Sequence, residues 1–286
     1  MSRLISEQFP GLDSGQVRPL AAGWDNELFT VAGDWVFRFP KRAQQVPCIL
    51  REIEIMPIVG ETLGSMVPRF DYLGQQSAAF PYPFVGYRRI PGVGADQVGS
   101  LDEARLARDL GRLLSRLHRV DARRIPATPV GWESEPWSAL RTGLVGVANT
   151  VRPLLDDDLL TVAEPYLAGG VPEPAQDDPS RFIHNDICPD HLLVDRASGH
   201  LSGLIDFGDA TVGDPVLDFV GLIGIRDRSF VDLVVAHYDL PLDDRFGFKL
   251  QWLTRVLTLT WLAEAAVHDP DEVGKHVAWI RRAFAR

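Results

Sequence analysis

The alternation of apolar and polar positions in the first third of the chain predicts a small sheet and one helix. Two runs rich in strand-forming residues, Leu28–Ala32 and Trp35–Phe39, flank Gly33-Asp34, a pair that favours a hairpin turn. Apolar residues then recur at helical spacing from Ile49 to Ile58. A third strand-like run covers residues 84–92 and ends in a Pro-Gly turn.

The remaining two thirds of the chain have mostly helical periodicity. Residues 100–103 read Ser-Leu-Asp-Glu, the pattern of a capping box led by Ser100, and apolar residues follow at helical spacing as far as Leu117. Longer helical patterns, interrupted by prolines and glycines, extend over residues 136–167 and 229–284. Short strand-like runs separate these helices at Arg181–His184, Leu192–Asp195 and Leu201–Ile205.

This distribution predicts an α+β fold in two lobes. We expect a smaller, sheet-rich lobe over residues 1–90 and a larger, mostly helical lobe over residues 91–286, joined by a linker at about residues 86–95. The chain of 286 residues, 45% of them apolar, is long enough to bury a core in each lobe.

Two short segments of the second half carry the strongest chemical signal. The first, FIHNDICPDHLLVD, places His184, Asp186 and His191 in the order of a kinase catalytic loop, where the aspartate accepts a hydroxyl proton. The second, GLIDFGDATVGDP, supplies Asp206 in an Asp-Phe-Gly element whose carboxylate holds Mg²⁺ against nucleotide phosphates. Together the two segments predict a phosphotransferase site, in which one aspartate orients the acceptor hydroxyl and the other neutralises phosphate charge through the metal.

Both aspartates have a simpler alternative role as turn residues that cap local backbone amides. Since His-x-Asp and Asp-Phe-Gly tripeptides also occur by chance, the prediction depends on finding both in turns between strand-like runs. His191 stands at a metal position, although Mg²⁺ prefers oxygen and imidazole is a poor ligand for it. We therefore expect His191 either to hold a second metal weakly or to bind phosphate-bound water.

On these residues the chain resembles the aminoglycoside phosphotransferase family, and most closely its 2''-phosphotransferases. That branch carries an H-N-D-x-x-x-D-H loop, followed by G-x-I-D-F-G-D-A and D-P-x-x-D-F, and this chain has the same residues at 184–191, 203–210 and 214–219. The resemblance covers nearly the whole chain. It implies a protein-kinase-like fold and transfer of the γ-phosphate of ATP or GTP to the 2''-hydroxyl of an aminoglycoside antibiotic, which confers resistance.

Other acceptors and another class of function remain open. Macrolide 2'-phosphotransferases share the Arg-x-Pro-Arg/Lys strand and the I-D-x-x-x-A segment, and kinases of small alcohols such as choline or homoserine come next. From a different class, the chain would be a catalytically silent, nucleotide-binding regulator. The intact Asp186 and Asp206 argue against that alternative.

The resemblance also implies a nucleotide site in the smaller lobe. Gly23 and Asn26 belong to a turn, residues 21–26, that would lie over the phosphates, and an ordinary turn ahead of the hairpin fits the same residues equally well. Tyr87 and Arg89 lie in the linker, whose backbone faces the purine. A bulky Tyr87 there could bias the site between ATP and GTP.

Arg38 occupies the position of the strand lysine that grips the α- and β-phosphates in kinases. Arginine keeps its charge at all pH values and binds phosphate with two hydrogen bonds, so the role can survive the exchange. Lys41 is the rival, because in an extended strand the two side chains point to opposite faces. Glu52, with Glu54 as a competitor, fits the helix carboxylate that pairs with the phosphate-binding cation.

The candidate acceptor residues rest on the region of the chain and on no matched motif, because the resemblance places the acceptor pocket among the C-terminal helices. Trp261 is a candidate for its border. The acidic candidates for binding amines are Asp227, Glu264, Asp269, Asp271 and Glu272.

Other polar residues near the motifs are interpreted as structural. Asp214 and Asp218 match family positions that anchor the catalytic loop and the following helix, with His184 as their partner. Asp209 could lie behind the metal site. Cys188 is interpreted as unreactive, because no base is expected beside its thiol.

Composition narrows the partners and the compartment. The net charge of −10, without any basic stripe, argues against nucleic acid and favours a cationic small molecule. Two isolated cysteines do not form a disulfide framework or a zinc site, which fits a reducing cytoplasm. There is no basic and apolar leader and no apolar run near the roughly 18 residues of a membrane helix, so we expect a soluble, cytoplasmic monomer.

Overall fold

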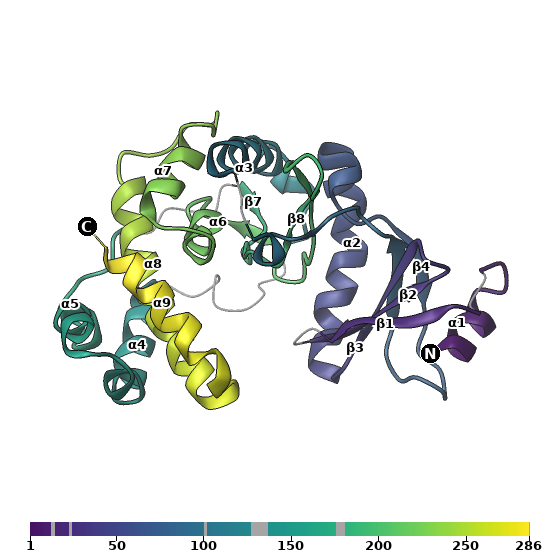
Figure 1. The fold of residues 1–286 in the computed structure, drawn as a ribbon, viewed down its shortest axis with the longest axis horizontal. Helices are drawn as coiled ribbons and strands as arrows, with labels where there is room; N and C mark the ends of the chain where they lie inside the picture. The colour runs from purple at the N-terminus through teal and green to yellow at the C-terminus, as the bar shows by residue number, and fades with distance from the viewer. Residues whose placement is uncertain (13–14, 23–24, 100–101, 127–136, 176–180, 286) are drawn as a thin grey trace.

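The computed structural model describes residues 1–12, 15–22, 25–99, 102–126, 137–175 and 181–285, which form two lobes (Figure 1). The strands of the smaller lobe are β1 (Val17–Ala22), β2 (Asn26–Val31), β3 (Trp35–Pro40), β4 (Phe70–Gly74) and β5 (Phe84–Arg88). They form one antiparallel sheet in the order β1-β2-β3-β5-β4. Helices α1 (Ser2–Gln8) and α2 (Val46–Leu63) complete this lobe.

The predicted hairpin forms between β2 and β3, with Val31 opposite Trp35. Ala32, which the sequence places in the strand, instead lies in the turn with a φ of 51°, beside Gly33 at 78°. The loop between Val31 and Trp35 therefore contains three residues, Ala32, Gly33 and Asp34, one more than the predicted Gly33-Asp34 turn. The strand therefore ends one residue earlier than predicted, because the turn needs that residue.

Alternation along β3 gives the sheet two different faces. Phe37 and Phe39 point to one face, where Phe39 stacks on Phe84 with the ring centroids 4.5 Å apart and apolar residues of α1 complete the cluster. Arg38 points to the opposite face, towards α2. Burial of the aromatic cluster thus fixes the orientation of β3 and turns Arg38 towards the space between the lobes.

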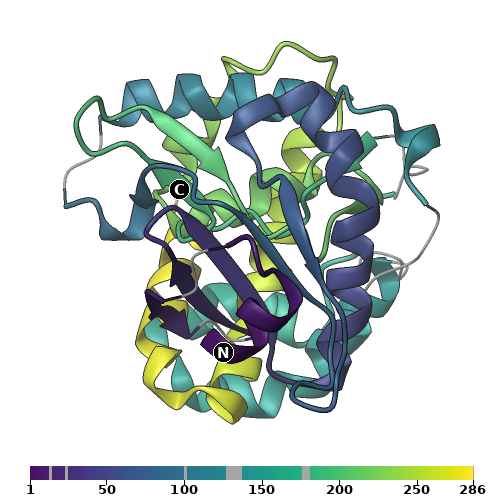
Figure 2. The same cartoon turned by 90° about the vertical axis from the view of Figure 1, so that its right-hand side faces the viewer.

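Helix α2 runs beside the sheet at the boundary with the larger lobe (Figures 1 and 2). It spans Val46–Leu63, longer at both ends than the predicted 49–58. Pro47 is tolerated because it lies in the first turn, where the missing N–H loses no helical partner. Pro57 lies inside the helix, which continues because Met56 and Val59 are buried in the core of the larger lobe.

The larger lobe is mostly helical. Its helices are α3 (Glu103–Leu117), α4 (Trp137–Val151), α5 (Asp157–Leu167), α6 (Leu217–Val220), α7 (Arg228–Val235), α8 (Phe246–His268) and α9 (Val273–Phe284). Its strands are β6 (Val93–Gly94), β7 (Arg181–Ile183), β8 (Leu192–Val194), β9 (Leu201–Leu204) and β10 (Thr211–Gly213), in the sheets β6-β8-β9 and β7-β10. Within the described residues, no helix combines the length and apolar character that crossing a membrane requires.

The start of α3 differs from the predicted capping box. Asp102 is the N-cap, and its carboxylate accepts a hydrogen bond of 3.0 Å from the backbone N–H of Arg105. A carboxylate at this position satisfies a free amide and also interacts favourably with the helix dipole. Ser100, the predicted cap, lies outside the described residues.

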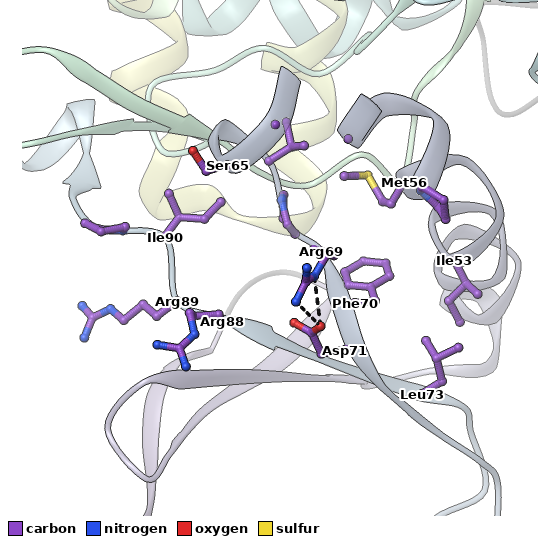
Figure 3. A pocket seen from close by; sticks show the side chains of 16 residues that line it. Ile53, Met56, Ser65, Arg69, Phe70, Asp71, Leu73, Arg88, Arg89 and Ile90 are labelled. Atoms are coloured by element: carbon purple, nitrogen blue, oxygen red, sulfur yellow. Dashed lines mark hydrogen bonds and ion pairs between the residues drawn. The ribbon is translucent and has the colours of Figure 1, made fainter. Parts of the chain in front are cut away.

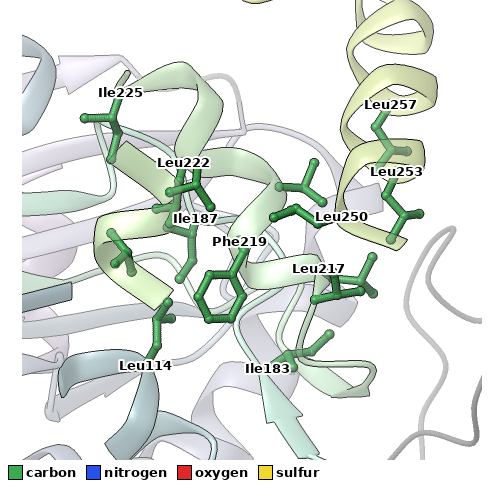
Figure 4. Packing of buried hydrophobic residues seen from close by; sticks show 14 of the residues in the cluster. Leu114, Ile183, Ile187, Leu217, Phe219, Leu222, Ile225, Leu250, Leu253 and Leu257 are labelled. Atoms are coloured by element: carbon green, nitrogen blue, oxygen red, sulfur yellow. The ribbon is translucent and has the colours of Figure 1, made fainter. Parts of the chain in front are cut away.

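The core of the larger lobe supports the loop that follows β7. Phe219 is fully buried in this core (Figure 4). Its ring meets that of Phe246 edge to face, with the ring centroids 5.1 Å apart. Ile187, the residue after Asp186, is also part of this core. The position of Asp186 therefore depends on apolar packing immediately beneath it.

Gly221, at the end of α6, allows the closest approach to this loop, because a Cβ there would overlap the carbonyl oxygen of Ile187. We predict that Gly221→Ala lowers the free energy of unfolding by about 1–3 kcal/mol, since the loop or α6 must shift. Chemical denaturation measures this change. In the control Gly146→Ala no atom lies within 4 Å of the added methyl group, so stability should stay the same or rise. Equal unfolding free energies for the two variants would contradict the close approach.

Candidate active site

The two motif segments meet at one point between the lobes. Strand β7 leads into Asp186, β9 leads into Asp206, and the imidazole of His191 lies between the two carboxylates. Its Nδ1 is 3.3 Å from Oδ2 of Asp186, and its Nε2 is 3.8 Å from Oδ2 of Asp206. Asn185 and Asp206 both have a φ of 66°, a value that is rare outside glycine and often marks functional sites.

Asp218 anchors the loop that contains Asp186, through backbone contacts. Its fully buried carboxylate accepts hydrogen bonds from the backbone N–H groups of His184 at 2.9 Å and Asn185 at 2.6 Å. The ring of His118 also contacts it, with Nε2 at 3.0 Å, while the other ring nitrogen of His118 contacts the hydroxyl of Tyr238 at 2.8 Å. The predicted partnership of Asp218 with His184 is thus made by the backbone of His184.

The ring of His184 joins the two motif segments. Its Nε2 donates to the carbonyl oxygen of Ile205 at 3.0 Å, and its Nδ1 accepts from the backbone N–H of Asp186 at 3.3 Å. This pair of contacts requires a neutral ring. Burial agrees with it, because it lowers the pKa of His184 to about 4.

The carboxylates of Asp186 and Asp206 have pKa values shifted in opposite directions. Desolvation in the cleft, together with the nearby Asp206, raises the pKa of Asp186 despite His191. Burial would also raise the pKa of Asp206, but the guanidinium of Arg38 and the ring of His191 outweigh it and lower that pKa. Burial opposes a charge on His191, yet the surrounding aspartates raise its pKa. Separated pKa values are typical of carboxylates with different chemical roles.

The side chains of Arg38 and Glu52 form a buried, bidentate ion pair. Nη1 of Arg38 donates to Oε1 of Glu52 at 2.9 Å and Nη2 to Oε2 at 2.7 Å, while Nη2 also lies 3.6 Å from Oδ1 of Asp206. Oε1 of Glu52 accepts a further hydrogen bond of 2.9 Å from the backbone N–H of Phe207. Lys41 follows β3 and is exposed, so of the two candidate cations it is Arg38 that faces Asp206.

A cavity of about 60 Å³ opens on the smaller-lobe side of Asp186, and Arg38, Asn26 and Asp206 are part of its lining. Asp209 lines it as well, and burial with the nearby carboxylates of Asp186 and Asp206 raises the pKa of Asp209 to about 6. This concentration of carboxylates is short of positive charge and offers the oxygen donors that Mg²⁺ prefers. The donors therefore fit Mg²⁺ with Asp206 as a ligand, whereas the imidazole of His191 is less suited.

The other expected nucleotide residues lie in different surroundings. Tyr87 is buried on the same face of the sheet as Arg38, and burial raises the pKa of its hydroxyl to about 12. Arg89 is exposed and lines a separate cavity beside the linker. Gly23 lies outside the described residues.

Two features near the loop were not foreseen from the sequence. Asp214, expected to anchor the loop, binds Nζ of the fully buried Lys249 at 2.9 Å, and that ammonium also meets Asp243 at 2.8 Å. The only sequence signal was a lysine within an apolar helical stretch. Cys188 does have a base beside it, since its Sγ lies 3.0 Å from Nδ1 of His191, but burial and the nearby aspartates raise the pKa of its thiol, which stays protonated.

A second cavity, of about 220 Å³, opens on the other side of Asp186. Its walls are largely apolar and aromatic. The lining residues are Asn185, Asp186, Ile187, Cys188, Asp190, Leu217, Val220, Gly221, Leu257, Trp261 and Trp279. Trp261 is thus beside Asp186, and among the lining residues Asp186 alone borders both this cavity and the smaller one.

The expected acidic acceptor residues do not line this cavity. Asp227 is the N-cap of α7, and its Oδ1 accepts from the backbone N–H of Ser229 at 3.1 Å. Glu264 is exposed on α8, and Asp269 follows the last residue of that helix. Asp271 and Glu272 lie in the next short turn. Helices α8 and α9 turn Leu257, Trp261 and Trp279 towards this cavity instead.

The neutral ring of His184 makes stability depend on pH. An unfolded histidine takes up a proton near pH 6.5, whereas the folded protein does so only near pH 4, so His184 contributes stability above pH 6.5 that is lost as the pH falls towards 4. We predict a loss of about 3 kcal/mol over this interval from the pKa difference. Denaturation at several pH values should show a shallower dependence of the unfolding free energy on pH for His184→Gln than for the wild type. A wild-type slope in His184→Gln would contradict the buried neutral ring.

Comparison with known proteins relates this geometry to a family. Residues 16–253 match a phosphotransferase enzyme family. The GDP complex of wild-type aminoglycoside 2'-phosphotransferase-IIIa has a TM-score of 0.77 at 27% identity, covering 99% of this chain and 96% of that one. The GDP and kanamycin complex of APH(2")-IIia has a TM-score of 0.73 at 26% identity, covering 99% and 97%.

More distant proteins share the fold or a short segment. Macrolide 2'-phosphotransferase MphH from Brachybacterium faecium has a TM-score of 0.67 at 20% identity, covering 99% of this chain and 97% of that one, a likeness of fold alone. The uncharacterized protein YcbJ of Bacillus subtilis is 37% identical over 60 residues, and this match spans 21% of this chain and 19% of that protein. Since the family match covers most of the sequence and the fold agrees, the chain belongs to the phosphotransferase enzyme family and has the kinase-like fold of its aminoglycoside phosphotransferases.

Proposed function

We propose that the protein transfers the γ-phosphoryl group of ATP or GTP to a hydroxyl group of an aminoglycoside antibiotic, at the 2'' position. The observation that carries this proposal is the place of Asp186, the one lining residue shared by two cavities of different chemistry. One cavity contains Arg38 and Asp206, groups suited to phosphate and metal. The other is large enough to admit part of an organic acceptor. A phosphoryl donor and an acceptor hydroxyl would therefore meet at Asp186.

In this mechanism the protein mainly positions the reactants and balances charge, as phosphoryl transfer requires. Arg38, held by Glu52, binds the nucleotide phosphates. Asp206 would hold Mg²⁺, and the bound ion would neutralise charge on the phosphate oxygens. Asp186 accepts the proton of the acceptor hydroxyl as its oxygen forms the new bond to phosphorus and the bond to the nucleoside diphosphate breaks. The raised pKa of Asp186 suits a group that must take up this proton.

Support for the aminoglycoside comes from the two similar structures, whose names give an aminoglycoside phosphotransferase with GDP and a related complex with GDP and kanamycin. The net charge of −10 also favours a polycationic acceptor, as an aminoglycoside is. We also propose that the protein confers antibiotic resistance and is a monomer in the cytoplasm. In that compartment the free cysteines Cys48 and Cys188 would stay reduced.

A macrolide is the second candidate acceptor, and the walls of the larger cavity favour it. Trp261, Trp279 and Leu257 offer apolar surface beside Asp186, while the acids expected for several ammonium groups lie elsewhere. A macrolide has one amine on a large apolar body, so it would use these walls more fully than an aminoglycoside would. An aminoglycoside would therefore need acidic groups in this cavity, whereas a macrolide would need its apolar walls.

Removing the proposed base tests the mechanism. We predict that Asp186→Asn binds nucleotide with unchanged affinity while kcat falls at least about 100-fold, because general-base assistance is lost. Asp206→Asn should instead weaken nucleotide affinity and change the dependence on Mg²⁺. Steady-state kinetics with calorimetric nucleotide binding separates the two. If Asp186→Asn keeps most of its kcat, Asp186 is not the base.

A kinase assay across kanamycin, gentamicin and erythromycin, with ATP and GTP side by side, tests the acceptor. We predict phosphorylation of an aminoglycoside with a KM that rises between low salt and a few tenths molar, because exposed charges are screened beyond roughly 8 Å at physiological salt. A macrolide KM would change little. Phosphorylation of erythromycin alone would replace the first candidate with the second.

The aromatic wall gives a test within the chain. We predict that Trp261→Ala raises the acceptor KM by about tenfold and leaves the nucleotide KM unchanged, because the indole lines the proposed acceptor cavity and not the cavity of Arg38 and Asp206. Glu264→Ala, on the exposed side of the same helix, is the control and should leave both values unchanged. A large effect of Glu264→Ala with none of Trp261→Ala would indicate that the acceptor binds at the acidic surface around Glu264 instead.

A further inference from the structure

A cavity larger than the two at Asp186 lies outside the site discussed above. It has a volume of about 690 Å³ and lies along the β4 edge of the sheet, between α2, β4 and the linker after β5 (Figure 3). Its apolar wall comprises Ile53, Met56, Val67, Phe70, Leu73 and Ile90. This volume is within the range of small-molecule sites, and it is three times that of the cavity beside Trp261.

This cavity is separate from the proposed phosphate and acceptor sites. It shares no lining residue with the two cavities at Asp186. In the sheet, β5 lies between β3, which carries Arg38, and β4, which borders the cavity. Helix α2 contributes different residues to the two regions, Glu52 to the ion pair and Ile53 to the cavity wall. An occupant would therefore lie apart from both cavities at Asp186.

The rim of the cavity is positively charged in an acidic protein. Arg69, Arg88 and Arg89 line it with one acid, Asp71, whereas the chain as a whole has a net charge of −10. Figure 3 shows the ion pair of Arg69 with Asp71, whose Nη2 and Oδ1 are 2.7 Å apart. The other two arginines are thus in excess over acids at this rim.

The two linker arginines differ in their contacts. Arg88 lies over the ring of Trp35 at 5.3 Å and lies 3.9 Å from Asp34. The guanidinium of Arg89 has neither a hydrogen bond nor an ion pair with any part of the chain that the structure describes, and it is exposed. An arginine beside an apolar cavity offers a planar, doubly donating partner for a carboxylate.

We propose that this cavity binds an amphipathic carboxylate, an organic acid with an apolar body. The body would lie against Phe70, Met56 and Ile90, and the carboxylate would bind the guanidinium of Arg89. The charge of the rim selects this occupant, since it repels a polycation such as an aminoglycoside. A neutral apolar molecule would contact the same apolar wall but would form no ion pair with Arg89.

The glycine of α2 that lines the cavity allows a clean blocking variant. No atom lies within 4 Å of a Cβ added at Gly60, so the leucine of Gly60→Leu would extend into the open space. Leucine is also the better helix former, so the variant should fold. The matched control is Gly146→Leu, in α4, where the added side chain also meets open space but outside any of the three cavities.

The binding experiment uses the full chain, with 1-naphthylacetate as the probe and its neutral amide, 1-naphthylacetamide, as the matched control ligand. Isothermal titration calorimetry should give a Kd for the acid at least about tenfold below that of the amide, because only the acid forms a charged hydrogen bond. Arg89→Gln should bring the two Kd values to within about threefold, whereas Arg196→Gln, at an exposed loop arginine, should keep the wild-type difference.

Blocking the cavity locates the binding. Gly60→Leu should weaken both ligands at least about tenfold and Gly146→Leu should weaken neither, because only the former fills the space. Equal Kd values for acid and amide in the wild type, or wild-type binding by Gly60→Leu, would overturn the proposal. So would a change in sedimentation of Gly60→Leu without a change in ligand binding, since the cavity would then be a contact between two copies of the chain.

Discussion

The buried ion pair of Arg38 and Glu52 is the interaction on which the rest of the site depends. It joins β3 to α2, and through Oε1 of Glu52 it also holds the backbone N–H of Phe207, the residue after Asp206. A charge buried without its partner is strongly destabilising, so neither side chain can turn away from the other without a large cost in stability. The aromatic cluster on the other face of the sheet fixes the same orientation of β3 by packing. Two independent forces thus present Arg38 to the cleft.

From that arrangement follows the division of roles between two nearby carboxylates. Arg38 lowers the pKa of Asp206 and keeps it ionised, as the proposed metal ligand must be, while Asp186 lies farther from this cation, in the desolvated cleft, and has a raised pKa. The neutral ring of His184 holds the backbones of both segments at a fixed distance. Arg38 thus sets the charge of Asp206, whereas His184 sets the backbone geometry of both segments. Each of the two aspartates can therefore have a pKa of its own.

Features that depend on residues close together in the chain could be predicted from the sequence. Features that depend on contacts between residues far apart in the chain could not. The β2–β3 hairpin and the turns that carry Asp186 and Asp206 follow from residues next to one another in the chain. Strands β1 and β4 and helix α1 escaped notice because their stability comes from pairing and aromatic packing across the sheet. The burial of Lys249 depends on Asp214, 35 positions away. The apolar character of the cavity beside Trp261 depends on which faces of α8 and α9 turn inwards.

A double-mutant cycle on the free energy of unfolding tests the central ion pair most directly. The measurement compares Arg38→Met, Glu52→Gln and the double variant with the wild type. Because each single change leaves a buried polar group without its partner, we predict a coupling energy of at least about 2 kcal/mol, with the double variant little less stable than either single variant. Losses that add to within about 0.5 kcal/mol would contradict the account, since independent side chains behave in that way.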